Sequence, residues 1–225
     1  RTYHNTFNSL PPNGIYHWDR QSNNGQNWHG SSHGSLWVKL LPFLEQDPLY
    51  SSLNFSLSGR NPGGQPRPFE NHWRNWGVFE TIGAMTEDLP QKALRSQIIP
   101  SLICPSANVD PYIHRSRFNI DPAISTYAWN IGAQRMGSWQ NICPNYPGNI
   151  FQTGPAGHGN EARGYRVSGV FARGNWAARF RDVTDGESQV IMVGEILPNK
   201  SDHACNGWMH YNTGWMATVG PINYP

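Results

Sequence analysis

Residues 35–46 read SLWVKLLPFLEQ, and this stretch sets the first part of the fold. Its apolar residues recur at the spacing of one helical face, at positions 36, 37, 40, 41 and 44. Ser35 precedes this face and predicts a helix N-cap, because a serine oxygen can accept a hydrogen bond from a backbone N–H of the first turn. Pro42 lies inside the pattern and should kink or shorten the helix, since proline has no backbone N–H to donate. The stretch therefore predicts a short, broken helix.

The rest of the sequence predicts helices early in the chain and strands late. Helices are predicted for residues 1–7, 48–53 and 87–99. Strands are predicted for residues 125–130, 169–171, 178–180 and 189–193. Segments rich in Gly, Pro, Asn and Ser lie between these elements and predict long ordered loops. Residues 1–225 therefore predict one α+β domain, with early helices packed on a late antiparallel sheet.

The composition and the missing motifs exclude several classes of protein. Charged residues make up 14% of the chain, against about 25% in an average domain. The net charge is +2 and no run of Lys or Arg stands out, so we expect no nucleic-acid partner. No stretch reaches the roughly 20 apolar residues of a membrane span. The sequence has no H-E-x-x-H, phosphate-loop or G-x-G-x-x-G motif, and we therefore expect a protein that is not an enzyme.

The acidic segment 181–188, RDVTDGES, is the best candidate for a metal site. Asp182, Asp185 and Glu187 bring three carboxylates close together in the sequence, with a glycine that permits a tight turn. Hard oxygen ligands at this density suit Ca²⁺, although the spacing is not that of an EF-hand loop. The alternative is a turn or cap, in which Asp185 and Thr184 bond nearby backbone N–H groups. The segment thus predicts either a calcium site or a structural turn.

Tryptophans in Gly- and Asn-rich surroundings form a second candidate site. Flat rings beside Asn and Gln side chains can stack on sugars, while the amides bind hydroxyl groups. The residues concerned are Trp73, Trp76, Trp139, Trp208 and Trp215. The alternative is that these rings fill a thin core or cover loops. The first interpretation predicts a surface that binds polysaccharide.

The three cysteines, Cys104, Cys143 and Cys205, have neither a zinc-site spacing nor a C-x-x-C motif. An odd count leaves one of them without a partner in this chain. Cys143 and Cys205 both lie in loop-like surroundings, and we expect them to form a disulfide in an oxidising compartment. Closing a loop of that length stabilises a fold by roughly 4 kcal/mol in the chain-entropy model. The alternative is three buried free thiols.

Several segments of the chain, taken in order, resemble one known family. They are residues 3–7 (YHNTF), 10–14 (LPPNG), 35–46, 49–50 (LY), 103–106 (ICPS), 181–188 with 191–195 (IMVGE), and 221–225 (PINYP). Together they resemble the planctomycete family of prepilin-like proteins, a family of unknown function. The acidic segment is the most specific of them. The order and spacing of the segments extend the resemblance over nearly the whole chain.

The resemblance implies a pilin-like fold and an exported protein at the cell surface or outside the cell. Family members begin with a pilin-type apolar helix, and many end in a His-x9-Asp-Gly signature. This sequence has neither, so we expect it to be the globular head that lies between them. The helix would assemble with like subunits or with pilus or secretion machinery, and it would be the only link to a membrane. Members also carry an early cysteine in that helix, with which Cys104 would pair.

Two hypotheses for the function follow. The first is a pilin- or pseudopilin-like structural subunit of a surface filament or other cell-surface assembly. The second is a surface module that binds polysaccharide or another exported ligand. A filament formed by the full-length protein would favour the first hypothesis, and a change of tryptophan fluorescence on adding glycan would favour the second.

Overall fold

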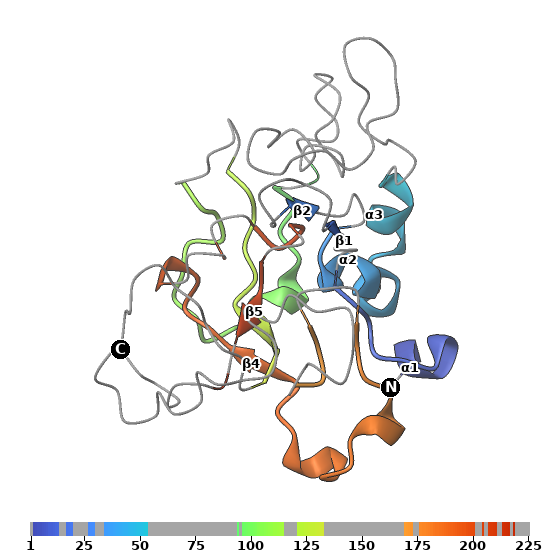
Figure 1. Ribbon diagram of the computed structural model, residues 1–225. Coiled ribbons are helices and arrows are strands. Elements are labelled where there is room, and N and C mark those ends of the chain that lie inside the picture. Colours follow the sequence, from blue (N-terminus) through green and yellow to red (C-terminus); the bar gives the residue numbers. More distant parts are fainter. Residues whose placement is uncertain are drawn as a thin grey trace, which may run out of the picture. The chain divides into compact units, whose positions relative to one another are not determined.

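The chain forms two compact units, and each is assembled from separate stretches of the sequence. Figure 1 shows the helices and strands, coloured in sequence order. The first unit contains Arg1–Asn13, Ala128–Gly194 and Trp215–Pro225, and the second contains Gly14–Tyr127 and Glu195–Gly214. The computed structural model describes residues 2–13, 17–19, 27–29, 34–53, 94, 96–114, 121–132, 169–172, 176–200, 204, 207–210, 213–216 and 218. No helix within these ranges is long and apolar enough to cross a membrane. Because the two units interleave along the chain, the single domain stays a prediction.

Helix α2 (Leu36–Leu40), in the second unit, begins where the sequence predicts it. Ser35 is the N-cap, and its Oγ accepts a hydrogen bond from the backbone N of Trp37 at 3.2 Å. The backbone then tightens into a 3₁₀ turn, Leu41–Leu44, with Pro42 near its start. Proline cannot supply the N–H that a continuing α-helix would use, so the predicted break at this residue is confirmed.

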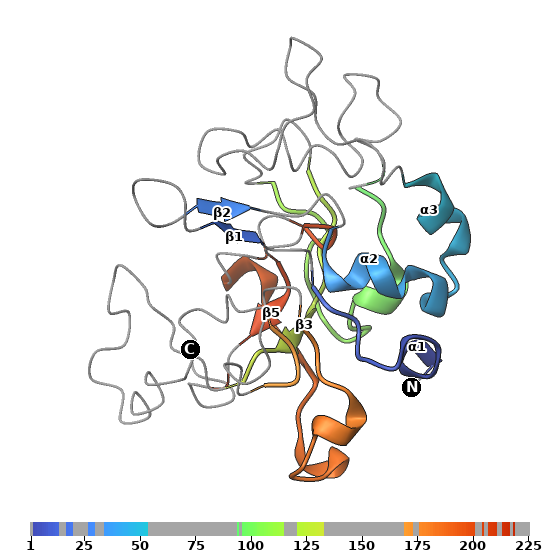
Figure 2. The ribbon, with the colours of Figure 1, turned by 45° about the vertical axis from the view of Figure 1, so that its right-hand side comes forward.

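Further short elements of the second unit surround α2 in the sequence. Helix α3 (Asp47–Ser52) follows it in Figure 2 and has a proline in its first turn, where proline is tolerated. Strands β1 (His17–Asp19) and β2 (Asn27–His29) form an antiparallel pair. The helix predicted for residues 87–99 falls largely outside the described residues.

Trp208 lies in the core of the second unit, is fully buried, and forms hydrogen bonds to three separate segments. Its Nε1 donates to the carbonyl oxygen of Gln97 at 2.9 Å, and its own carbonyl accepts from Ser35 Oγ at 2.6 Å. Its backbone N donates to Ala123 O at 2.9 Å. The preceding Gly207 has a φ of +78°, and a Cβ there would lie 2.9 Å from Ala123 O, so this position requires glycine. Segments that are far apart in the sequence therefore meet at one indole ring.

A three-stranded sheet lies later in the chain, with the order β4-β3-β5. The central strand is β3 (Tyr127–Asn130), and its neighbours are β4 (Val193–Glu195) and β5 (Trp215–Met216). Strands β3 and β5 are parallel, with Trp129 opposite Trp215. This pairing joins residues that are widely separated in the sequence, which no local pattern specifies.

Strand β4 runs antiparallel to β3. Asn130 N donates to Met192 O at 2.9 Å, whereas Ile196 N donates to Thr126 O at 2.8 Å, so the end of one strand meets the start of the other. The side chain of Asn130 adds a bond to Ile191 O at 2.9 Å. The sheet is therefore mixed and differs from the antiparallel sheet that the sequence predicts, because a long connection returns β5 parallel to β3. The wider α+β, pilin-like arrangement stays a prediction.

Helix α1 (Thr2–Phe7), in the first unit, has no buried side chain. Two contacts fix it to a distant segment of the same unit. Leu10 N, just after the helix, donates to Ala178 O at 2.8 Å. The His4 ring stacks on the Phe180 ring with centroids 4.2 Å apart, and its Nε2 accepts from Phe180 N at 3.2 Å. The helix is thus held at one side by a ring contact and a short backbone connection.

Candidate functional site

The segment that the sequence predicts to bind calcium folds into two short 3₁₀ turns, Phe180–Asp182 and Glu187–Gln189. Asp182 is not part of a metal-ligand cluster among the residues that the structure describes. Its Oδ2 accepts a hydrogen bond from the backbone N of Arg179 at 2.8 Å, so this carboxylate caps its own turn. Arg181 Nε lies 3.9 Å from Asp182 Oδ1, an exposed ion pair that contributes little.

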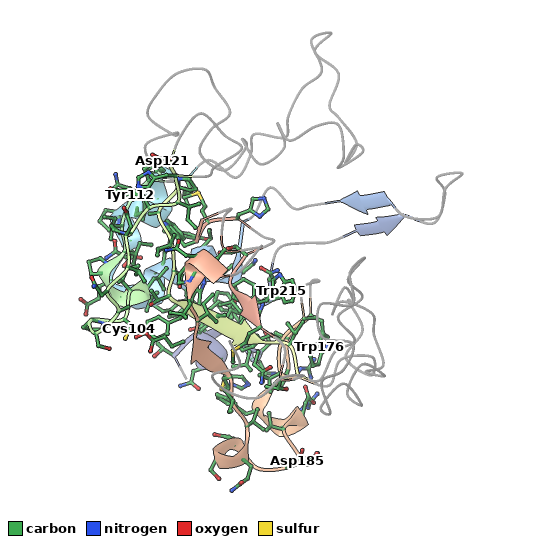
Figure 3. The ribbon with its side chains drawn as sticks, turned by 90° about the vertical axis from the view of Figure 1, so that its left-hand side faces the viewer. Cys104, Tyr112, Asp121, Trp176, Asp185 and Trp215 are labelled. Atoms are coloured by element: carbon green, nitrogen blue, oxygen red, sulfur yellow. The ribbon has the colours of Figure 1, made fainter. Side chains whose placement is uncertain are left out.

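The other two carboxylates of this segment, those of Asp185 and Glu187, are exposed. Figure 3 labels Asp185, which lies in the loop that contains these two turns. No group of three or more His, Cys, Asp or Glu side chains within the described ranges could hold a metal ion. The Asp182 carboxylate forms a backbone cap, which the sequence alternative assigned to Asp185 and Thr184, and the calcium site stays a prediction.

The two described tryptophans of the candidate sugar site, Trp208 and Trp215, are buried. Stacking on a sugar requires an exposed ring face, which neither of them offers. Their surroundings are rich in glycine and polar residues, but the rings fill the interior, as the core alternative has it. The remaining three, Trp73, Trp76 and Trp139, lie outside the described residues. The two tryptophans that the structure describes therefore give the polysaccharide hypothesis no support.

The predicted disulfide between Cys143 and Cys205 also lies outside the described residues. Cys104 is a half-buried free cysteine. Its Sγ lies 3.1 Å from Ser106 Oγ, and its backbone N donates to Thr126 Oγ1 at 2.7 Å. The backbone around this thiol is thus fixed to the residue just before β3.

Residues 30–34 read GSSHG and have the G-x-S-x-G spacing of a hydrolase nucleophile turn. That turn sits between a strand of a parallel sheet and a helix. Here the preceding strand β2 pairs with β1 in an antiparallel pair. Residues 30–33 lie outside the described residues. The spacing therefore has no supporting context within the part of the chain that the structure describes.

A cluster that the sequence did not predict brings two carboxylates to one imidazole, and we call it the histidine clamp. His114 Nδ1 lies 2.9 Å from Asp121 Oδ2, and His114 Nε2 lies 3.0 Å from Asp110 Oδ2. All three side chains are exposed. Asp110 Oδ1 also accepts a hydrogen bond from Tyr112 N at 2.9 Å. Figure 3 labels Tyr112 and Asp121, which lie close together.

The clamp changes the proton affinities of its members. The carboxylates of Asp121 and Asp110 raise the pKa of His114, because both accept hydrogen bonds from the charged ring. The backbone bond from Tyr112, and then the bond from His114, lower the pKa of Asp110. Both ring nitrogens are occupied, so neither is available as a metal ligand or a general base while the clamp is closed. The cluster is suited to holding structure rather than to catalysis.

Strand β4 and its flanks show a regular alternation of exposure, at the edge of the three-stranded sheet. Residues 191, 193, 195 and 197 are exposed, whereas 192, 194 and 196 are half-buried. Ile191 is 48% exposed, Val193 42% and Leu197 65%. Three of the four exposed side chains are therefore apolar, with Glu195 as the exception. Apolar side chains in a row at a sheet edge are typical of a contact surface.

Lys39 on α2 buries its amine, the end of the side chain that lysine usually keeps in water. Its side chain is only half-buried, but its Nζ is inaccessible to solvent and has no hydrogen-bond partner among the described residues. Lysine normally buries its stem and keeps its amine in water. Burial lowers the pKa of Lys39 to about 8. The described structure therefore contains a charged group that opposes folding at neutral pH.

Comparison with known proteins gives one match. A family model described as "Protein of unknown function (DUF1559)" matches residues 1–221. No curated protein and no solved structure matches the chain. The match extends over nearly all of the sequence, so it concerns the two units together and not an isolated motif.

Proposed function

Because the chain belongs to the DUF1559 family, we propose that it is the globular head of an exported, pilin-like surface protein. Its role is to assemble with like subunits rather than to catalyse a reaction. The main support is the apolar row on β4, which leaves Ile191, Val193 and Leu197 in contact with water. Burying such side chains against a partner is favourable by roughly 25 cal/mol per Å² of apolar surface.

The register of β4 suits pairing with a second copy of itself. The backbone of Met192 bonds to β3 and that of Ile196 to Thr126 just before it, so the backbone groups of Val193 and Glu195 point to the other edge of β4, where no described strand pairs. Two β4 strands paired antiparallel about Gly194 would place Val193 opposite Glu195 of the other copy. The two Glu195 carboxylates would then avoid each other, and both edges would gain backbone hydrogen bonds.

Helix α1 offers a second apolar surface. Phe7 is 56% exposed, and its ring lies 4.5 Å from that of Tyr3. A helix of this length is marginal in water without tertiary packing. A neighbouring subunit that covered the exposed part of Phe7 would remove apolar surface from water.

The proposal is tested on the full-length gene product in its native host, carrying an epitope tag. We expect antibody to label intact cells, and shearing to release fibres that electron microscopy detects. The variant Ile191→Ser/Val193→Ser should reduce fibre yield without loss of the protein, whereas Glu187→Gln, an exposed position outside β4, should leave it unchanged. A tag that is protected inside intact cells, or a surface protein that stays monomeric, would contradict the proposal.

A further inference from the structure

The histidine clamp lies on a hairpin of the second unit. Ile113 N donates to Pro122 O at 3.1 Å, and Ile124 N donates to Pro111 O at 2.9 Å. Tyr112 and Ala123 form an antiparallel bridge between these bonds. Residues 110–114 and 121–124 are therefore two arms that run in opposite directions, and the clamp joins them at the end where the connecting segment begins.

We propose that His114 is a pH-sensitive fastener of this hairpin, which ties the two arms together while its ring is protonated and releases one carboxylate when the ring becomes neutral. Asp110 belongs to the same arm as His114, and Asp121 belongs to the opposite arm. The bond from Nδ1 to Asp121 is therefore the one that crosses the hairpin. The bond from Nε2 to Asp110 orients the ring for it.

The two bonds require a charged ring. A carboxylate can only accept, and imidazole carries N–H groups on both nitrogens only when it is protonated. After deprotonation one nitrogen presents a lone pair to a carboxylate oxygen, so one of the two bonds is replaced by a repulsive contact. Asp110 is also held by Tyr112 N, which keeps this carboxylate in place whichever bond is lost.

The direction of the pH effect follows from the two shifts. The pKa of His114 is higher in the folded chain than in the unfolded chain, so its contribution is present below the ordinary histidine value and is lost as pH rises through the raised pKa. The pKa of Asp110 is lowered, so its contribution is lost as pH falls through that lowered value. Both bonds of the clamp are therefore present at pH values between the lowered pKa of Asp110 and the raised pKa of His114. Because the clamp is exposed, salt should weaken it.

Asp121 is fixed from a second side, which makes it a firm anchor for the crossing bond. Its backbone carbonyl accepts a hydrogen bond from Ser96 Oγ at 2.7 Å. The arm that contains Asp121 is thereby connected to the segment that leads into the core. Release of His114 should consequently loosen the arm of residues 110–114 more than the arm of residues 121–124.

The test is hydrogen exchange and NMR titration of the purified chain. Protection of the Ile113 and Ile124 amides, corrected for intrinsic exchange, should fall by roughly two- to fivefold as pH rises through the pKa of His114, with the larger fall at Ile113. Asp121→Asn should lower the pKa of His114 and remove this step, and His114→Gln should remove it as well. Glu187→Gln, which changes an exposed carboxylate of the first unit, should preserve it. Protection without such a step in the unsubstituted chain, or a step that persists in both hairpin variants, would overturn the proposal.

Discussion

Two basic side chains of the second unit, Lys39 and His114, lie in opposite environments. The Lys39 amine is shielded from water with no described partner, and burial lowers its pKa to about 8. His114 is exposed and lies between two carboxylates, which raise its pKa. The buried group therefore loses its proton more easily than usual, and the exposed one keeps it longer. Partners, rather than depth alone, decide whether a charge helps this fold.

The largest change in the free energy of unfolding is expected for a substitution of Lys39. Lys39→Met replaces the buried ammonium with an apolar chain and should stabilise the protein at pH 7, by at most about 3 kcal/mol. The pKa in the folded chain lies below the ordinary value of 10.5, so the unfolded chain binds more protons between about pH 8 and that value. The stability of the unsubstituted chain should therefore rise with pH across this window, and the rise should be absent in the variant. Urea unfolding at several pH values measures both.

A matched control for Lys39 is Arg181→Met, which removes an exposed charge. It should change the free energy of unfolding by less than about 0.5 kcal/mol. Equal pH dependence of the unsubstituted chain and of Lys39→Met would show that the amine reaches water, and the contrast with His114 would then disappear.

Ser35 sharpens the comparison, because it is buried like the Lys39 amine but has partners. Its Oγ accepts from Trp37 N and donates to Trp208 O. Ser35→Ala should therefore destabilise the fold by about 1–2 kcal/mol, through loss of the cap and of one buried bond. Ser188→Ala at an exposed position serves as the control in the same unfolding measurement. A neutral Ser35→Ala would mean that these two bonds contribute nothing net.

The smallest effect is expected at Asp182, a carboxylate that is bonded at the surface as those of the clamp are. Asp182→Ala removes the acceptor of Arg179 N and should cost up to about 1 kcal/mol, whereas Asp182→Asn should keep most of it. Asp185→Ala, at a neighbouring exposed carboxylate, should be close to neutral. Thermal unfolding of the three variants gives the order, and an equal loss for Asp182→Ala and Asp185→Ala would refute the capping role.

Local features were predictable from the sequence, and long-range ones were not. The Ser35 cap and the break at Pro42 depend on hydrogen bonds within a few residues, so spacing alone indicates them. The burial of Trp208 depends on Gln97 and Ser35, and its Gly- and Asn-rich neighbours suggested exposure instead. The parallel pairing of β3 with β5 was not predicted either, because β5 comes from a distant part of the sequence.

The candidate sites show the same division. Asp182, Asp185 and Glu187 are close in the sequence, yet they do not converge. Asp110 and Asp121 are further apart, and the hairpin brings both to His114. The available signal was an Asp and a His four residues apart, followed by a second Asp next to a proline. Without the pairing of Tyr112 with Ala123, nothing in that pattern specifies which groups meet.

The parallel pairing of Trp129 with Trp215 has a consequence for how the protein is made. A ribosome delivers the central strand long before the strand that will cover its far side. Until β5 is made, the nascent polypeptide therefore has an incomplete sheet. The unpaired edge of β3 can then bind chaperones or other copies of the chain. Synthesis that pauses ahead of residue 215 would lengthen this vulnerable interval, and release of the finished C-terminal part would end it.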